Sequence, residues 1–237
     1  ILIAVVVGAI AVFNMVRGII KSAPDIKDID ATPTGYLSTV LDNNENEIAT
    51  LVASGSNRVY VTIDEIPKNL QHAFVAIEDE RFYDHNGIDL QGILRAGVRG
   101  ITHGFHFSEG ASTITQQLLK NNVFTGWTSE SSFSDKLERK LQEQYLAVQL
   151  EKSVSKDWIL ENYLNSINLG QNTLGVQSAS RRYFNKDVSE LNISESAVIA
   201  AITQNPSRYN PVSNPDQNKK RRAKVLKNML DQEYISQ

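Results

Sequence analysis

The first residues of the chain are almost entirely apolar, and this run limits the available folds more than any other feature. Ile1–Phe13 contains only apolar residues and glycine, and the apolar character continues beyond it, interrupted by Asn14 and Arg17. A helix that is apolar on every side is either buried in a core or crosses a membrane. A cleaved signal peptide is the third explanation, but no convincing A-x-A cleavage site precedes Pro24. We therefore predict an uncleaved transmembrane anchor over residues 1–21.

Composition sets broad limits on the rest of the chain. The 237 residues are 41% hydrophobic, enough for one sizeable core or for a main domain with a small one. The net charge of −3 does not favour a large nucleic-acid footprint, so no nucleic-acid partner is expected. The absence of cysteine excludes disulfides and thiolate metal sites but does not assign a compartment.

Residues 22–63 differ in character from the C-terminal part of the chain and are predicted to form a linker and a β-strand region. The linker is polar and contains Pro24 and Pro33. Alternating apolar residues and an intervening cluster of turn residues indicate short strands. These strands are expected over Tyr36–Leu41, Glu47–Val52 and Asn57–Ile63.

Residues 64–237 have helical patterning and are predicted to form the main domain. Asp64-Glu65-Ile66-Pro67 has the character of a helix start, and helical apolar spacing follows it. Helices are expected over Leu70–Ile77, Asp135–Glu151, Lys156–Leu164, Ser194–Ala201 and Pro215–Tyr234.

Glu78–Gly87 concentrates chemistry-bearing side chains. It holds four carboxylates, aromatic residues and a histidine directly after the apolar run Ala73–Ile77. A carboxylic acid at the edge of a core can act as a general acid or base. The charged end of an ordinary helix would have much the same sequence, so this stretch alone does not establish a functional site. A second polar stretch, Gly110–Asn121, favours the functional interpretation.

Together these stretches resemble the first two signature motifs of the peptidoglycan glycosyltransferases, the lipid II polymerases. That family comprises monofunctional enzymes and the N-terminal half of class A penicillin-binding proteins. The first motif, E-D-x-x-F-x-x-H-x-G, is matched by Glu78, Asp79, Phe82, His85 and Gly87. The second, G-G-S-T-I-T-Q-Q-L-x-K-N, is matched from Ser112 to Asn121, with Glu109-Gly110-Ala111 in place of its start.

Three further motifs come next in the family's order. Arg139-Lys140-Leu141-Gln142-Glu143 resembles R-K-x-x-E, and on a helix both cations neighbour the carboxylate. Lys156–Asn165 matches K-x-x-I-L-x-x-Y-L-N; its apolar members are expected in the core, and its asparagines are expected to organise the fold around the site. Arg221–Leu226 resembles R-R-x-x-V-L, and we favour Arg222 as the arginine that faces the site.

The resemblance implies a role for each matched residue. Glu78 would be the general base and Glu143 the second catalytic carboxylate, which orients cations or holds a divalent Mg or Mn ion. No organic cofactor is implied. Cations would stabilise the departing pyrophosphate: Lys120, Arg139, Lys140 and Arg222. The other implied substrate-binding residues are Asp79, Phe82, His85, Ser112, Thr113, Gln116, Gln117 and Asn165.

The resemblance also implies fold, function and location. The fold would be mainly α, a lysozyme-like two-lobed glycosyltransferase domain. The reaction would join lipid II into β-1,4-linked glycan strands with inversion, releasing undecaprenyl pyrophosphate, and the enzyme would be a moenomycin target. Arg17 and Lys21 disfavour an outside position under the positive-inside rule, so the family sets the orientation: a single-pass bacterial membrane protein with an extracytoplasmic catalytic domain. Partners would be lipid II, the lipid-linked glycan strand, membrane lipid, and cell-wall synthesis, division or elongation proteins.

Two departures from the family pattern stand out. Glu78 and Glu143 are 65 positions apart, more than the family leads us to expect, which places an insertion in the polar loop Thr125–Asp135. Glu109 replaces a glycine. A strand pair before the main domain is typical of bifunctional members, so we expect a truncated bifunctional enzyme.

Other interpretations remain open at this point. A lysozyme-like glycan hydrolase would also use carboxylates on sugars, but it has no need of the cations that suit a pyrophosphate. An inactive membrane-anchored scaffold is the other alternative. Ser153–Lys156 fits the S-x-x-K of transpeptidases, but no K-[ST]-G follows. Phe105, Phe107 and Trp127 would either dip into the bilayer or fill the small lobe's own core.

Overall fold

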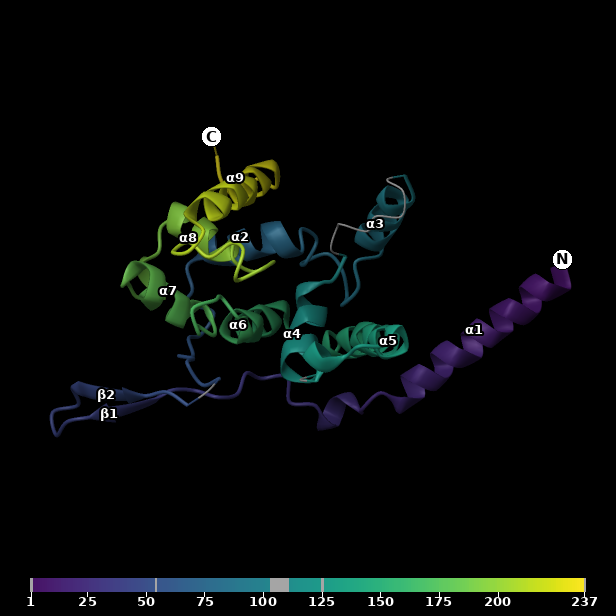
Figure 1. Cartoon of the computed structure of the whole chain (residues 1–237), viewed down its shortest axis with the longest axis horizontal. Helices are drawn as coiled ribbons and strands as arrows, with labels where there is room; N and C mark the ends of the chain where they lie inside the picture. The colour runs from purple at the N-terminus through teal and green to yellow at the C-terminus, as the bar shows by residue number, and fades with distance from the viewer. Residues whose placement is uncertain (1, 54, 103–110, 125, 237) are drawn as a thin grey trace.

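The computed structural model describes residues 2–53, 55–102, 111–124 and 126–236. The chain is mainly helical, as expected, with one short pair of strands (Figure 1). In chain order the elements are α1 (Leu2–Ser22), η1 (Ile26–Asp28), β1 (Ser38–Leu41), β2 (Glu47–Leu51), α2 (Lys68–Glu78), α3 (Leu90–Thr102), α4 (Ile114–Asn122), η2 (Trp127–Ser129), α5 (Phe133–Leu150), α6 (Lys156–Ser166), α7 (Val176–Phe184), η3 (Val188–Glu190), α8 (Ile193–Ala200) and α9 (Pro215–Asp231).

Helix α1 extends away from the rest of the molecule (Figure 1). Its apolar side chains are exposed, with Ile3 at 80% and Phe13 at 65%. In the described part of the chain, Val5–Asp28 is the segment long and apolar enough to cross a membrane, and its most apolar stretch is not buried in the protein. A core helix would be buried, so this interpretation of the apolar run is wrong. The exposed helix is compatible with a membrane anchor.

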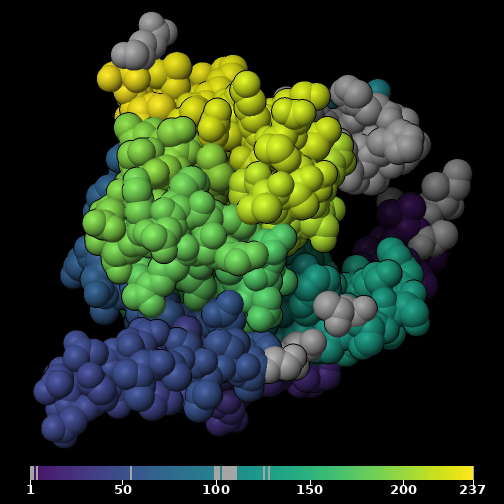
Figure 2. All heavy atoms as spheres, turned by 60° about the vertical axis from the view of Figure 1, so that its left-hand side comes forward, coloured from purple at the N-terminus to yellow at the C-terminus, as the bar shows by residue number. Residues whose placement is uncertain are grey.

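Strands β1 and β2 form an antiparallel hairpin that projects from the body (Figure 2). The register pairs Ser38 with Leu51, and a bulge lies between Val40 and Leu41. The Asp42 carboxylate closes the turn by accepting from the Asn46 side chain and from turn amides, which holds the pKa of Asp42 below its usual value. Every strand residue is exposed, so the hairpin is joined to the body at its base.

The third predicted strand, Asn57–Ile63, is wrong. The segment forms one isolated bridge, between Arg58 and Leu174. Its backbone groups bond to side chains of α6 in place of a neighbouring strand: the Val61 amide donates to the Asn165 side chain at 3.0 Å. The alternating apolar residues therefore reflect an extended segment that lies along a helix.

The core lies between two sets of packed helices. Helix α2 packs against α8 and α9, and α4 packs against α5 and α6. Phe74, Phe82 and Tyr163 are fully buried at the centre, and the rings of Phe74 and Tyr163 meet edge to face at 6.2 Å. Truncating an aromatic side chain at such a place costs about 3–5 kcal/mol. This core fixes the C-terminal end of α2, where the acidic stretch begins.

Gly87 allows the loop after α2 to touch α5. Its φ is +93°, a conformation that favours glycine, and a Cβ there would lie 2.5 Å from the Ala147 backbone carbon. The glycine of the first motif therefore brings the acidic loop against the helix that carries the third motif.

Candidate active site

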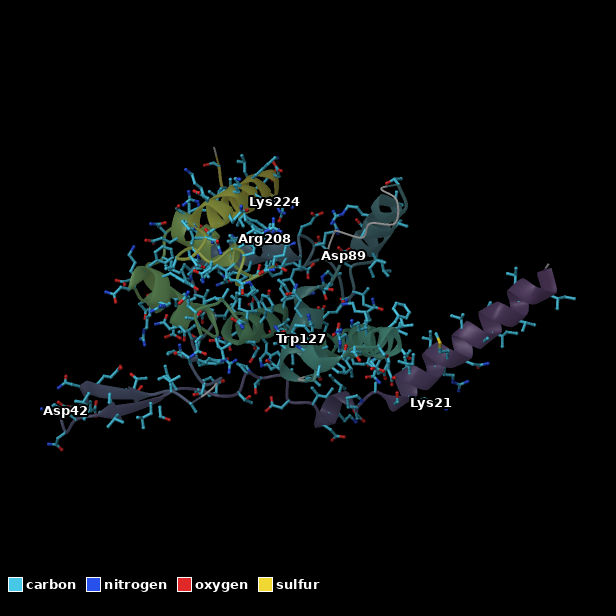
Figure 3. All side chains as sticks on the ribbon, viewed as in Figure 1. Lys21, Asp42, Asp89, Trp127, Arg208 and Lys224 are labelled. Carbon is cyan, nitrogen blue, oxygen red and sulfur yellow. The ribbon has the colours of Figure 1, made fainter. Side chains whose placement is uncertain are left out.

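A cleft of about 730 Å³ lies between the end of α2, helices α4 and α5, the turn after α8, and α9. Ten of the predicted functional or matched motif residues line it. They are Glu78, Asp79, Ser112, Gln116, Gln117, Lys120, Asn121, Lys140, Glu143 and Arg221. Lys224, labelled on α9 in Figure 3, also lines the cleft. Residues from four of the five motifs thus converge on one hollow.

Glu78 is the last residue of α2, and its side chain is 14% exposed. The Gln117 amide donates to its Oε2 at 3.0 Å, and the Thr203 hydroxyl contacts its Oε1. Tyr163 in turn donates to the Gln117 carbonyl at 3.1 Å. Burial raises the pKa of Tyr163, and the charges of Glu78 and Asp79 raise it further, so the phenol stays a donor. The carboxylate is therefore held in place by a chain of hydrogen bonds that starts in the core.

Asp79 and His85 form a buried support behind Glu78. The ring Nε2 of His85 lies 3.0 Å from both carboxylate oxygens of Asp79. The Ile114 amide, at the N-terminus of α4, donates to the same carboxylate at 2.9 Å. Asp79 reaches the cleft wall, but its oxygens are occupied by these contacts. The first motif is thereby tied to the start of the second.

Lys140 is the cation with the most contacts in the cleft. Its Nζ lies 2.8 Å from both Ser112 Oγ and Gln116 Oε1, and 3.2 Å from Glu143 Oε2. Arg139 bonds the other oxygen of Glu143 and also bonds Glu130. Glu143, with a side chain only 1% exposed, therefore orients two cations and has little surface of its own toward a substrate.

Lys120 lies in the cleft beside Trp127, which Figure 3 labels next to α4. Its Nζ is 3.7 Å from the centre of the indole ring, a cation–π contact. Burial lowers the pKa of Lys120, while the charge of Glu143 works in the opposite direction. Because partial burial has already removed some water from this ammonium, pairing it with an anion would cost less desolvation than for a fully exposed lysine.

Arg221, and not the predicted Arg222, faces the cleft. Its Nη2 is 3.8 Å from Glu78 Oε1, and its guanidinium lies 5.1 Å from the centre of the Tyr209 ring. Its Nε is buried without a hydrogen-bond partner in the described part of the chain. Neighbouring residues on a helix point about 100° apart. Helix α9 turns Arg221 inward, and Arg222 is absent from the described residues that line the cleft.

Several predicted substrate-binding residues are not among the described residues that line the cleft. Phe82 is fully buried in the core. The Thr113 hydroxyl caps α4 and donates to the Gly87 carbonyl, and Asn165 is fully buried and bonds to the backbone at Val61. Arg139 acts through Glu143 from outside the cleft lining, and His85 acts through Asp79. Their contacts in the structure are with the protein itself, and their predicted role in substrate binding stays a prediction.

Other residues of the cleft were missed by the sequence reasoning. Thr203 and Gln204 come from the turn after α8, which carries none of the five motifs. Lys224 and Asn228 follow Arg221 on α9 at helical spacing, and this spacing is the one signal that could have found them. The remaining cleft residues without a functional prediction are Ala76, Ile77, Glu80 and Arg95.

The donor set around Glu143 does not fit a divalent cation. Both of its oxygens face cations, Arg139 and Lys140. Among the described residues, no group of three or more histidine, aspartate or glutamate side chains could hold a metal ion. A divalent ion would need hard oxygen ligands that this arrangement does not provide. This arrangement argues against the predicted Mg or Mn ion but does not test it, so the ion stays a prediction.

The serine and the lysine of the S-x-x-K stretch bond to different partners. Ser153 donates to the Leu150 carbonyl, while Lys156 bonds Glu151 and the His85 carbonyl, so the two residues form no catalytic pair.

In the loop expected over Thr125–Asp135, the described residues include η2, and α5 starts at Phe133. Phe105 and Phe107, expected either to dip into the bilayer or to fill the small lobe's own core, lie outside the described residues.

Comparison with known proteins places the chain in a class. The model of the transglycosylase family matches residues 44–230. The chain therefore belongs to the transglycosylase family, and its class is that of the peptidoglycan glycosyltransferases. The prediction of a mainly helical transglycosylase fold with an apolar N-terminal helix is confirmed.

Its relatives include penicillin-binding protein 1F of Bacillus subtilis, which is 47% identical over 199 residues, covering 84% of this chain and 26% of that protein. Penicillin-binding protein 1A of Clostridium acetobutylicum is 43% identical over 237 residues, covering 96% of this chain and 29% of that protein. The chain thus spans less than a third of the length of these relatives. A crystal structure of penicillin-binding protein 1A from Haemophilus influenzae aligns with 88% of this chain and 20% of that one, at a TM-score of 0.46 and 23% identity.

Proposed function

We propose that this chain polymerises lipid II into β-1,4-linked glycan strands, with Glu78 as the general base and a lipid pyrophosphate as the leaving group. One observation carries the proposal. The Glu78 carboxylate, held by Gln117 and Thr203, shares its cleft with the cations Lys120, Lys140 and Arg221. A glycan hydrolase has no need of such a set of cations.

The base acts on the acceptor sugar. A sugar hydroxyl is a poor nucleophile at neutral pH, and a carboxylate within hydrogen-bond reach can remove its proton as the new bond forms. The acceptor O–H bond breaks and its proton moves to Glu78. The oxygen forms a bond to the anomeric carbon of the donor on the face opposite the leaving group, so the configuration inverts.

The cations act on the leaving group. The bond from the anomeric carbon to the pyrophosphate oxygen breaks, and its electron pair departs with the phosphate. Lys140 and Lys120 can stabilise this growing charge, and Ser112 and Gln116, which already bond Lys140, offer further polar contacts. Glu143 keeps Lys140 in place through their ion pair. A preorganised cation of this kind contributes about 10²–10³-fold to the rate.

The chain would work at a membrane surface. Helix α1 would anchor it, with the catalytic domain on the extracytoplasmic side. Helix α3 presents a second apolar surface: Leu90, Ile93, Leu94 and Val98 recur at helical spacing and are 73%, 36%, 69% and 53% exposed. An amphipathic helix of this kind fits the lipid interface, where the polyprenyl chain of the substrate must remain.

The direct test is the formation of polymer from lipid II, read on a gel. The parent chain is expected to form glycan strands, and Glu78→Gln is expected to reduce the rate by about 10²–10⁴-fold, the usual contribution of a general base. Glu45→Gln, at the exposed hairpin turn, is the matched control and should behave like the parent. Equal activity of Glu78→Gln and the parent would remove Glu78 from its role.

A further inference from the structure

The hydroxyl of Thr203 lies between two acceptors. Its Oγ1 is 2.5 Å from Oε1 of Glu78 and 3.0 Å from the backbone oxygen of Ala200. A hydroxyl carries one proton and two lone pairs. Thr203 can therefore donate to only one of these oxygens at a time, and it keeps the capacity to accept a hydrogen bond.

The Ala200 oxygen is available because α8 ends there. The last carbonyls of an α-helix have no partner within the helix. The Thr203 amide approaches the Ala200 oxygen only loosely, at 3.5 Å. The threonine proton can thus turn to this oxygen without breaking another hydrogen bond.

The other partner of Glu78 has no such freedom. The Gln117 Nε2 group donates to Glu78, while the Gln117 carbonyl accepts from Tyr163. The amide is therefore held as a donor. Of the two side chains that hydrogen-bond Glu78 in the described part of the chain, Thr203 is the one that can change from donor to acceptor.

We propose that Thr203 is a positioning residue that holds Glu78 in both of its protonation states. While Glu78 is a carboxylate, the hydroxyl donates to Oε1. Once Oε1 carries the proton taken from the acceptor sugar, the carboxyl O–H donates to Thr203 Oγ1, and the threonine proton turns to the Ala200 oxygen. The proton taken from the sugar stays on Glu78 and is accepted by Thr203, and the threonine proton is accepted by the Ala200 oxygen. This role rests on the proposed function of Glu78 as the base.

Other charged and titratable groups face Glu78 from each neighbouring element. Arg221 of α9 is 3.8 Å away, and Tyr163 of α6 lies behind Gln117. The rest of the cleft contributes Asp79, Glu80, Arg95, Lys120, Lys140, Glu143 and Lys224. All of these groups remain when Thr203 is replaced, so a change in the pH response of a Thr203 variant reports the lost hydroxyl.

The test compares Thr203→Val, which lacks the hydroxyl, with Thr203→Ser, which keeps it. Because the charge-assisted hydrogen bond to the carboxylate is stronger than the neutral one to the protonated acid, losing both should move the acid limb of the polymerisation profile, kcat/KM against pH, to higher pH by up to about one unit. Thr203→Ser should restore the parent profile. A lower kcat with an unmoved acid limb in Thr203→Val would overturn the proposal, because that result indicates packing alone.

A second measurement separates this proposal from the proposed function. The Glu78 carboxyl is titrated in the full chain by carbon-13 NMR, its signal being identified by its loss in Glu78→Gln. Thr203→Val, or Thr203→Ala if the valine variant does not fold, should titrate at higher pH than the parent. Thr173→Val is the matched control, since its hydroxyl bonds a loop carbonyl away from Glu78. Identical titrations in all variants would refute the role of Thr203, whatever the chain does with lipid II.

Discussion

At the scale of single residues, the motifs divide into side chains that face the cleft and side chains that hold those in place. Glu78, Gln117 and Lys140 face the cleft. Asp79 with His85 supports the first motif from behind. The support matters because a catalytic group displaced by about 1 Å loses about 10²-fold in rate. The sequence alone could not separate the two kinds of residue. A motif shows which residues occur together, but it does not show which side chains face the cleft.

The two arginines of the fifth motif offer a clean comparison. Arg221→Gln should reduce polymerisation by about 10²-fold, because it removes the cation beside Glu78. Arg222→Gln, which makes the same change one position away and outside the cleft lining, should remain close to the parent. The rates of lipid II consumption measure both. The opposite order would restore the interpretation that the sequence favoured.

Asp89 links the acidic loop to the start of α3, and its contribution to stability depends on pH. Its carboxylate accepts from Arg81 at 2.6 Å and from the Gly92 amide at 2.9 Å. Burial works to raise the pKa of Asp89, but these hydrogen bonds outweigh it and hold the pKa below its usual value. A group whose pKa is lowered by folding stabilises the protein above its unfolded pKa, about 3.9, and this stabilisation is lost as the pH falls through the folded value.

Asp89→Asn is therefore expected to lower the free energy of unfolding by about 1 kcal/mol at neutral pH. The difference from the parent should shrink as the pH falls below about 4, where Asp89 of the unfolded chain is protonated, and it should vanish below the lowered pKa of the folded protein. Urea unfolding followed by circular dichroism at several pH values measures this. A difference that stays constant down to about pH 2 would show that the charge of Asp89 is not involved.

At the scale of elements, periodicity predicted α2, α5, α6, α8 and α9, which bury apolar side chains in the shared core, but it did not predict α3, α4 or α7. It failed for Asn57–Ile63, where alternation is typical of a strand but the backbone bonds to α6. Periodicity also did not predict that the turn after α8 supplies Thr203 to the site. A pattern of apolar residues reports burial, and several local structures can satisfy the same burial.

Helix α3 offers a test of membrane contact that uses the absence of cysteine from the chain. A single cysteine at Leu94, labelled with a fluorophore sensitive to polarity, should show blue-shifted emission when the protein is placed in liposomes, because its side chain is 69% exposed on the apolar face. The same label at Asn44 in the hairpin turn is the control and should report water. Water-like emission from both positions would exclude contact between α3 and lipid.

At the scale of the whole molecule, the anchor helix and the catalytic helix α5 are joined. The Gln142 side chain donates to Ser22 Oγ at 3.1 Å and approaches the Ile19 carbonyl at 3.4 Å. Gln142 lies on α5 between Lys140 and Glu143. The linker is attached as well, since Asn122 donates to the Ala31 carbonyl at 2.7 Å. The sequence predicted an anchor and a domain, but it did not predict the contact between α1 and α5. Hydrogen bonds between polar side chains that are distant in the chain produce no periodic pattern in the sequence.

The most direct test of the account counts leaving groups against linkages formed. The full chain is given lipid II, and lipid pyrophosphate release and glycosidic linkages are measured over the same time course. One pyrophosphate released for each linkage in the parent, with both rates reduced together in Glu78→Gln, is the predicted result. Pyrophosphate or free sugar released without linkages would indicate hydrolysis, and unchanged rates in Glu78→Gln would show that another group is the base.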